Sequence, residues 1–382
     1  MIALVLALAL VTLCESTFSP LRRRHRSREE RDHGCQGVQT CRERLKDFIE
    51  TPEEDWWTSV FQVAFPQYNR FPPPYVVTPR TAEEVREAME CLHKEGTRVS
   101  VKGGGHNYAG FSAANGREGG VQLNLKRNMR SIVDVSSEWN GTPAIRGEAG
   151  LVFRDVYLWL NDTSNNLSEY LLAGGFCPTV GIAGFHLAGG LGALSQEFGL
   201  GVDNVLQVTM VTANGSAIVN ASATENADLF WALRGGGGGS LGVVTHFVLR
   251  LHPLTALFPE PKKPMYTYGE FCVAPSMSSP GEIKLELLRF AQHYDDIPRW
   301  LTISWRLVKT EQAKGLCYLF YSLRSWEETR PILSPIINLP SSDDGILLGS
   351  YPEGESNADL SDNLVCLSFC AFSSFIAFLS LP

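Results

Sequence analysis

The stretch "RVSVKGGGHNYAGFS", residues 98–112, places three consecutive glycines directly before a histidine. A helix interior does not favour such a run, because each glycine costs roughly 1 kcal/mol relative to alanine. A strand interior is weakened as well. Glycine is retained where the backbone bends unusually or where another group approaches it closely. The stretch therefore predicts a loop against which something large lies, with His106 at its end.

Three further glycine clusters follow, at residues 173–184, 188–201 and 234–242. One cluster alone is a weak signal, but four indicate backbone that lines a long, phosphate-bearing ligand, because successive N–H groups form an anion-binding concavity. None of the clusters ends in the G-K-[ST] of a P-loop. Residues 237–242 fit G-x-G-x-x-G. A helix is expected before them and a strand after them, which is the reverse of the order in a Rossmann fingerprint.

The periodicity around these clusters predicts one α+β region from about residue 69 to 253. Thr81 is the expected N-cap of its first helix. We expect helices at 81–96, 153–162 and 225–235, and strands at 98–101, 121–125, 131–135, 144–149, 205–221 (a hairpin about Asn214-Gly215) and 242–253. Prolines at 258–264 mark a boundary to a second domain. We expect strands there at 269–275, 301–307 and 315–323, with a helix within 279–298.

Composition and charge limit the functional classes. The chain has 382 residues, of which 44% are apolar and 19% charged, as in a globular protein with a large core. Its net charge of −8 disfavours nucleic acid as a partner, because nucleic-acid binding needs a basic face. The basic run at 22–31 is interpreted as a solvated segment, with a processing site as the alternative.

The N-terminus predicts secretion. Residues 2–14 are apolar and too few to span a bilayer, as in a signal peptide, which we place at 1–16. Five N-x-[ST] sequons support an extracellular glycoprotein. They begin at Asn140, Asn161, Asn166, Asn214 and Asn220. The uncharged stretch at 364–382 fits a membrane span, a lipid-anchor signal or a defective gene end, and these alternatives stay open.

The cysteines fit an oxidising compartment. There are nine, and Cys14 lies in the expected signal peptide. Cys91 lies on the amphipathic segment of the first helix, and we expect it to pair with either Cys35 or Cys41. Cys177 stands apart, inside a glycine-rich stretch.

Four motifs carry a resemblance to a known family: "VSVKGGGHNYAG" from residue 99, "GGFCPTVGIAGFHLAGGLG" from 174, "GVDNVLQVTMVTANG" from 201 and "ENADLFWALRGGGGGSLGVVTHFVLRLHP" from 225. Their order and spacing over residues 66–253 resemble the berberine bridge enzyme-like FAD-linked oxidoreductases, which have the vanillyl-alcohol-oxidase type of fold. The resemblance implies an α+β protein: a two-lobed FAD-binding domain of the PCMH type, followed by a substrate domain with an antiparallel sheet and helices.

The resemblance also implies which residues touch the cofactor, mostly through backbone N–H groups. At the FAD pyrophosphate it implies Gly103, Gly104, Gly105, Asn107, Gly110 and Ser112. On the flavin side it implies Gly181, Gly184, Gly189, Gly190 and Gly192, and at the adenine Val243 and Val244.

Two side chains match covalent attachment points of the family. His106 matches the residue that bonds the flavin 8α-methyl, and Cys177 the residue that in many members bonds flavin C6. Neutral imidazole and thiolate are both nucleophiles, so the chemistry fits. A structural histidine and a disulfide are the respective alternatives. His186 and His246 are expected to be packing residues, and no histidine pair has metal-ligand spacing, so no metal is predicted.

The implied reaction oxidises a C–H bond beside oxygen or nitrogen in an alcohol, a sugar or a secondary metabolite. A hydride goes to the flavin, and O2 then becomes hydrogen peroxide. The family links the residue three after the cysteine to oxygen access. Here that residue is Val180, the smaller variant, which favours an oxidase over a dehydrogenase.

The C-terminal part departs from the family pattern. A Y-x-N segment and a catalytic base are not found, so we expect a truncated substrate domain and leave the catalytic residues unknown. The alternative function is a catalytically impaired flavin-binding glycoprotein, or a fragment. The expected divisions are 1–16 signal peptide, 17–65 N-terminal segment, 66–253 FAD-binding domain, 254–350 partial substrate domain and 351–382 apolar tail.

Overall fold

The structure is a computed structural model, and its description stays within the compact unit that begins at Cys41. The described residues are 40–51, 71–114, 116–139, 141–161, 169–237, 239–257, 267–273, 280–309, 314–337, 339 and 346–350. The expected signal peptide, the basic run at 22–31 and the apolar tail at 364–382 lie outside them. Within these residues, the helices are all too short or too polar to cross a membrane.

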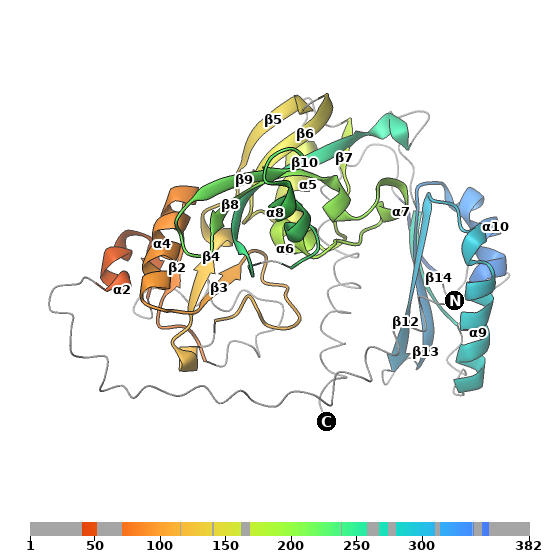
Figure 1. Cartoon of the computed structure of the whole chain (residues 1–382). Coiled ribbons are helices and arrows are strands. Elements are labelled where there is room, and N and C mark those ends of the chain that lie inside the picture. Colours follow the sequence, from red (N-terminus) through yellow and green to blue (C-terminus); the bar gives the residue numbers. More distant parts are fainter. Residues whose placement is uncertain are drawn as a thin grey trace. The chain divides into compact units, whose positions relative to one another are not determined.

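The first sheet carries the glycine-rich stretch at 103–105. Its strand order is β1 (Ile49–Glu50), β2 (Val76–Val77), β4 (Val121–Asn124) and β3 (Val99–Lys102). β2 and β3 both run parallel to β4, and helix α4 (Ala82–Lys94) makes the crossover between β2 and β3 (Figure 1). Parallel strands need such a crossover. β3 is an edge strand, so the loop after it begins at one edge of the sheet.

Helix α4 begins where the sequence predicts. The Thr81 side chain accepts a hydrogen bond from the Glu84 backbone N–H at 3.2 Å, as an N-cap does. Val85, Ala88, Met89 and Leu92 recur at helical spacing and are buried, so one face of the helix joins the core.

The second sheet is antiparallel and has β10 (Gly242–Pro253) near its centre. The order is β5 (Ile132–Trp139), β6 (Thr142–Glu148), β10, β8 (Val205–Thr212) and β9 (Ile218–Ser222), and β7 (Tyr170–Leu172) pairs with the end of β10. β8 and β9 form the hairpin expected about Asn214-Gly215. The turn contacts α4, because Arg86 Nη1 donates to the Gly215 carbonyl at 3.4 Å.

One hydrophobic core joins the first two sheets. Helices α5 (Phe153–Asn161), α6 (Ile182–Leu187) and α8 (Ala227–Leu233) contribute to it, and α7 (Ser195–Phe198) is a single turn without buried residues. Among the buried side chains of this core are Leu92, Leu123, Phe153, Ile182, Phe230 and Phe247. The α+β class is therefore confirmed, and the loops between these elements are held by a packed interior.

The third sheet is antiparallel, with helices on one face (Figure 1). Its order is β12 (Leu301–Lys309), β13 (Lys314–Ser322), β11 (Thr267–Val273) and β14 (Ile346–Ser350), with α9 (Pro280–Gln292) and α10 (Trp326–Ile337). A separate core holds it together, including Leu301, Tyr318, Phe320, Leu333 and Ile336. The sequence did not predict α10 or β14; α10 contains Pro331 and Pro335, which read as helix breakers.

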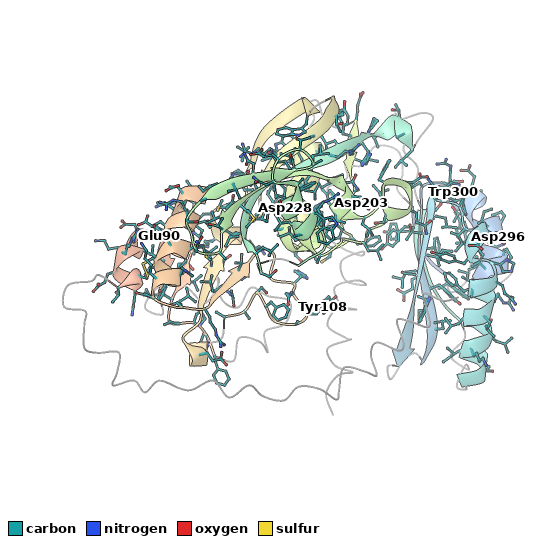
Figure 2. All side chains as sticks on the ribbon, in the orientation of Figure 1. Glu90, Tyr108, Asp203, Asp228, Asp296 and Trp300 are labelled. Atoms are coloured by element: carbon teal, nitrogen blue, oxygen red, sulfur yellow. A yellow bond between two sulfur atoms is a disulfide. The ribbon has the colours of Figure 1, made fainter. Side chains whose placement is uncertain are left out.

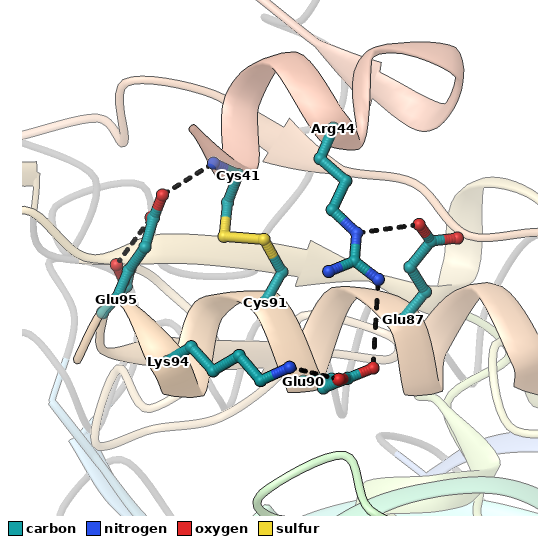
Figure 3. The surroundings of a disulfide bond; sticks show 8 residues. Cys41, Arg44, Glu87, Glu90, Cys91, Lys94 and Glu95 are labelled. Atoms are coloured by element: carbon teal, nitrogen blue, oxygen red, sulfur yellow. Dashed lines mark hydrogen bonds and ion pairs between the residues drawn. A yellow bond between two sulfur atoms is a disulfide. The ribbon is translucent and has the colours of Figure 1, made fainter. Parts of the chain in front are cut away.

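A disulfide ties the four-residue helix α2 (Cys41–Arg44) to α4 (Figure 3). Cys41 and Cys91 are joined, which selects one of the two expected pairings. Polar contacts flank the bond: the Cys41 backbone N–H donates to Glu95 Oε1 at 2.6 Å, and Arg44 Nε lies 3.2 Å from Glu87 Oε1. The N-terminal end of the described chain is thereby fixed to the first sheet's crossover helix.

Breaking this disulfide should lower stability. The bond closes a loop between residues 50 apart in sequence, so the chain-entropy estimate of its contribution is about 4 kcal/mol. We expect Cys91→Ser to shift the midpoint of urea unfolding to lower concentration under non-reducing conditions. Equal midpoints for the oxidised wild type and the variant would contradict this.

Candidate cofactor site

A cavity of about 1010 Å³ opens beside the loop that follows β3. Its walls come from four parts of the chain: residues 98–113, 118–125, 180–190 and 236–244. This volume matches the upper range of small-molecule and cofactor sites. Figure 2 shows Tyr108 extending from the same loop, where its side chain is half exposed. The site thus lies in the first core, between segments that are far apart in sequence.

Two glycines meet backbone to backbone under this cavity. A Cβ on Gly104 would lie 2.1 Å from the Gly181 nitrogen, and a Cβ on Gly181 would lie 2.2 Å from the Gly104 nitrogen. No side-chain rotation relieves such a clash, because the obstructing atoms are backbone. Glycine at both positions therefore lets the loop after β3 touch the loop before α6.

The first loop presents a run of backbone donors without acceptors. Within the described part of the chain, the N–H groups of residues 103–107 donate no hydrogen bond. Gly104 and Gly105 are buried, and buried N–H groups are nearly always paired in native proteins. Successive unpaired donors at a cavity wall are the arrangement that binds phosphate oxygens. The residues present therefore fit a ligand that carries a pyrophosphate.

His106 lies at the end of this run and is held by one side chain. Its Nε2 is 2.9 Å from the Thr179 hydroxyl oxygen. Burial, together with the smaller effect of the positive charge of Lys126, lowers the pKa of His106 to about 4. The imidazole is therefore neutral at neutral pH, the state in which one ring nitrogen keeps a lone pair.

The Thr179 hydroxyl that contacts His106 also lies near Cys177. Cys177 is 9% exposed, and its Sγ is 3.4 Å from Thr179 Oγ1. In the structure, Cys177 is disulfide-bonded. A sulfur in a disulfide has no thiolate, so a flavin bond at Cys177 requires this disulfide to be open.

A buried lysine precedes the glycine run. Lys102 is 1% exposed, and burial lowers its pKa to about 7, with the charge of Lys126 acting in the same direction and Glu50 opposing it. An anion bound at the adjacent loop would favour the charged form of both lysines. The local electrostatics therefore agree with a negatively charged ligand.

Most of the residues assigned from the sequence line this cavity. They are Gly103, Gly104, Gly105, His106, Asn107, Gly110, Ser112, Val180, Gly181, Gly184, Gly190 and Val244. Those outside its lining are Cys177, Gly189, Gly192 and Val243. The Val243 side chain is buried in the core, and Gly192 is close to the Gly174 carbonyl, which a Cβ would meet at 2.0 Å.

Part of the cavity lining was not predicted from the sequence. The fourth glycine cluster was recognised, yet its cavity residues Gly236, Gly237, Gly239, Ser240 and Gly242 were not chosen. Val99 and Val101 of β3 also line the cavity, and alternation along a strand gives no signal for which face a ligand uses. Thr179 was overlooked, although it lies between two residues that were chosen.

His186 is a packing residue, as expected. His186 is fully buried among aromatic rings, including those of Phe153 and Phe247, and its Nδ1 lies 2.7 Å from the Ile182 carbonyl. Burial lowers its pKa to about 4. No group of three or more His, Cys, Asp or Glu side chains in this part of the chain is arranged to hold a metal ion.

Comparison with known proteins identifies the domain. Residues 73–220 match the FAD binding domain family, and this segment is therefore an FAD binding domain. The chain is 38% identical over 201 residues to the glucooligosaccharide oxidase of Sarocladium strictum, covering 53% of this chain and 37% of that protein. It is 35% identical over 217 residues to berberine bridge enzyme-like 23 of Arabidopsis thaliana, covering 54% and 38%. The expected resemblance is confirmed.

The chain spans little more than a third of the length of these two relatives. Among solved structures, it is similar to two variants of the grass pollen allergen Phl p 4, at 22% identity. A variant with asparagine changed to histidine is a glucose dehydrogenase; its TM-score is 0.65, over 86% of this chain and 65% of that one. The variant that adds an isoleucine-to-valine change is a glucose oxidase; its TM-score is 0.63, over 80% and 58%. These likenesses show the fold.

The contact between Gly104 and Gly181 should be intolerant of a methyl group. We expect Gly104→Ala to destabilise the protein by roughly 1–3 kcal/mol or more, because the backbone must shift. It should also lose bound FAD. Gly103→Ala is the matched control, since its Cβ would meet nothing closer than 3.5 Å. Thermal unfolding and the flavin absorbance of the purified proteins measure both effects. Equal values for the two variants would rule out a steric role for this contact.

Proposed function

Because residues 73–220 form an FAD binding domain, we propose that the chain is a secreted FAD-linked oxidase acting on an alcohol, a sugar or a secondary metabolite. Bound FAD would supply the hydride acceptor for this chemistry. The observation that carries the proposal is the run of unpaired N–H groups at residues 103–107, at the wall of a cavity large enough for a cofactor. These donors would hold the pyrophosphate.

Different residues would bind different parts of FAD. Backbone from residues 103–107 would take the phosphates, and Val180, Gly181 and Gly184 would lie along the flavin. The main chain of Val244 would contact the adenine. An apolar enclosure would keep water from the reacting centre and strengthen the polar contacts within it.

We further propose that His106 bonds covalently to the 8α-methyl carbon of the flavin. Its neutral imidazole supports this, because a lone pair is needed for nucleophilic attack. One methyl C–H bond and one imidazole N–H bond would break and one C–N bond would form. The two electrons and two protons released would reduce O2 to hydrogen peroxide, so the step balances. Cys177 would provide a second bond only when its disulfide is open.

The names of two similar proteins support a carbohydrate or other hydroxyl-bearing substrate. The relative from Sarocladium strictum is a glucooligosaccharide oxidase, and the two Phl p 4 variants act on glucose. The substrate class proposed here stays at alcohols, sugars and secondary metabolites. A catalytic base is not assigned to any residue.

Secretion rests on the apolar residues 2–14 and the sequons. Two of the five sequon asparagines have described side chains. Asn214 is exposed in the turn between β8 and β9, and Asn220 is exposed on β9. Both are therefore accessible to a glycan.

Val180 supports an oxidase. Its side chain is partly buried against the core and lines the cavity. In Phl p 4, an isoleucine-to-valine change separates the glucose oxidase variant from the glucose dehydrogenase variant. A valine at this wall would leave a path for O2 that a larger side chain would close.

Flavin retention tests the proposed function. Protein expressed through a secretory pathway should keep its yellow colour after acid precipitation and fluoresce in a denaturing gel. His106→Ala should still bind FAD but release it on precipitation, because the bonding nitrogen is gone. His246→Ala is the matched control, a half-buried histidine outside the cavity lining, and should keep its flavin.

The outcomes distinguish a flavin bond at Cys177, the lack of any covalent bond and the lack of FAD binding. Flavin that stays on His106→Ala but leaves the double variant with Cys177→Ala would assign the bond to Cys177. A colourless wild-type pellet with all FAD in the supernatant would refute covalent attachment. Protein that binds no FAD at all would refute the proposed function.

The oxygen path can be tested without a substrate. We expect Val180→Ile to slow reoxidation of the photoreduced flavin by O2 roughly ten-fold or more, the scale of one added methylene in a tight site. Val180→Ala should react at least as fast as the wild type. Stopped-flow absorbance after mixing with oxygenated buffer gives the rates. Equal rates for isoleucine and valine would remove Val180 from the oxygen path.

A further inference from the structure

We propose that Asn220 is N-glycosylated and that its glycan keeps the open edge of β9 from pairing with the same edge of a second copy of the chain. The inference rests on the proposed secretion, because this modification takes place in the secretory pathway. It adds a modified residue and a role for the modification. It starts from the sequon Asn220-Ala221-Ser222, which lies within an edge strand of the second sheet (Figure 1).

The backbone groups of alternate β9 residues face away from the sheet. The Ser222 N–H donates to the Glu225 carbonyl at 2.7 Å, and therefore not to β8. In an antiparallel strand, every second residue directs both its N–H and its C=O to the same side. Asn220 and Ile218 therefore face outward as well. In agreement, the Asn220 carbonyl accepts a hydrogen bond from Asn226 Nδ2 at 2.6 Å.

The chain itself closes only part of this edge. The return after β9 binds the Ser222 N–H and the Asn220 carbonyl. Among the described residues, the Asn220 N–H and both backbone groups of Ile218 have no hydrogen-bond partner. Unpaired N–H and C=O groups on a sheet edge are a template on which another strand can add.

β9 lacks the devices that commonly protect a sheet edge. These devices are charged side chains, prolines and bulges. Residues 212–224 contain no charged residue and no proline, and β9 pairs with β8 in regular register over all its five residues. Ile218 on this strand is 38% exposed. An uncharged and partly unpaired edge of this kind needs another form of protection.

The Asn220 side chain presents its nitrogen for a glycan. Its Oδ1 accepts a hydrogen bond from the hydroxyl of Thr209, its partner on β8, at 2.8 Å. Its Nδ2, the atom to which a glycan is attached, makes no hydrogen bond to any described residue, and the side chain is exposed. The oxygen is thus held while the nitrogen is free, beside the backbone groups that lack partners.

The position of Asn220 on the edge decides what its glycan blocks. A second copy would add to this edge through its own β9, because a two-fold axis brings identical surfaces together. Asn220 is the middle one of the three outward residues, between Ile218 and Ser222. Pairing of two β9 edges would therefore bring the two glycans against each other. A glycan is bulky and solubilising, so it excludes this contact.

The other sequon of this hairpin offers a matched control. Asn214 is also exposed, but it lies in the turn that packs against α4. Arg86 Nη1 donates to the Gly215 carbonyl, and a Cβ on Gly215 would lie 2.1 Å from the Glu90 nitrogen. Since this turn is joined to the helix, a glycan on Asn214 does not guard the unpaired groups of β9.

Three variants of the full chain, secreted and loaded with flavin, test the proposal. We expect Asn220→Gln to lower the dissociation constant of self-association roughly ten-fold or more, the worth of one or two hydrogen bonds. Asn220→Asp also lacks the glycan but puts a charge on the edge. It should stay at the wild-type value, because like charges directly opposite each other are unfavourable. Asn214→Gln should match the wild type. Sedimentation over a range of protein concentrations gives the constants.

Two further measurements locate the glycan and the contact. Mass spectrometry of peptides from the secreted wild type should find a glycan on Asn220. Hydrogen exchange followed at two protein concentrations locates the interface of Asn220→Gln. The amides of residues 218–220 should exchange more slowly at the higher concentration, because a second strand then supplies their acceptors.

These measurements separate the possible failures. An unmodified Asn220 in the secreted protein, equal self-association of Asn220→Gln and the wild type, or equal self-association of the Gln and Asp variants would each overturn the inference. All three results would leave FAD binding and the proposed function untouched. A chain that stays in the cell without any glycan would refute the proposed secretion, and the glycan on Asn220 with it.

Discussion

The close contact between Gly104 and Gly181 is the constraint on which the rest of the site depends. It requires two residues without a side chain, one after a parallel strand and one before a short helix. Residues 103–107, beside this contact, line the cavity, and within the described part of the chain their N–H groups donate no hydrogen bond. The Thr179 hydroxyl lies within hydrogen-bond reach of both His106 and Cys177. A ligand with phosphate groups supplies the acceptors that the loop lacks.

The sequence predicts the fold wherever local and long-range signals agree. The N-cap and amphipathic period of α4 and the Asn-Gly turn between β8 and β9 gave the correct elements. Helix α10 was not predicted, and its Pro331 and Pro335 are unfavourable in a helix interior. The reciprocal capping bonds of Ser325 and Glu328, each at 3.3 Å, start this helix, and the pattern Ser-x-x-Glu was available in the sequence. Packing of its buried residues against β12 and β13 outweighs the proline penalty.

The site was partly predictable, for a similar reason. Glycine runs reveal where backbone is approached closely, so the first loop and the stretch at 181–190 were found. They do not reveal which group makes the approach: at Gly192 it is the Gly174 carbonyl and not a ligand. Val243, expected at the adenine, has its side chain buried in the core. Thr179 carries no sequence signal, because it meets His106 through a hydrogen bond across 73 residues of chain. The disulfide at Cys177 likewise depends on tertiary contacts that spacing does not give.

Peptide mapping tests most directly the central claim that the loop after β3 holds the cofactor with His106 against the flavin. Trypsin cuts after Lys102 and Arg117, so residues 103–117 form one peptide that contains the whole glycine run and His106. The account predicts that this peptide, from the flavin-loaded protein, is heavier by the mass of FAD less two hydrogens. An unmodified peptide, with FAD recovered free or on another peptide, would contradict it.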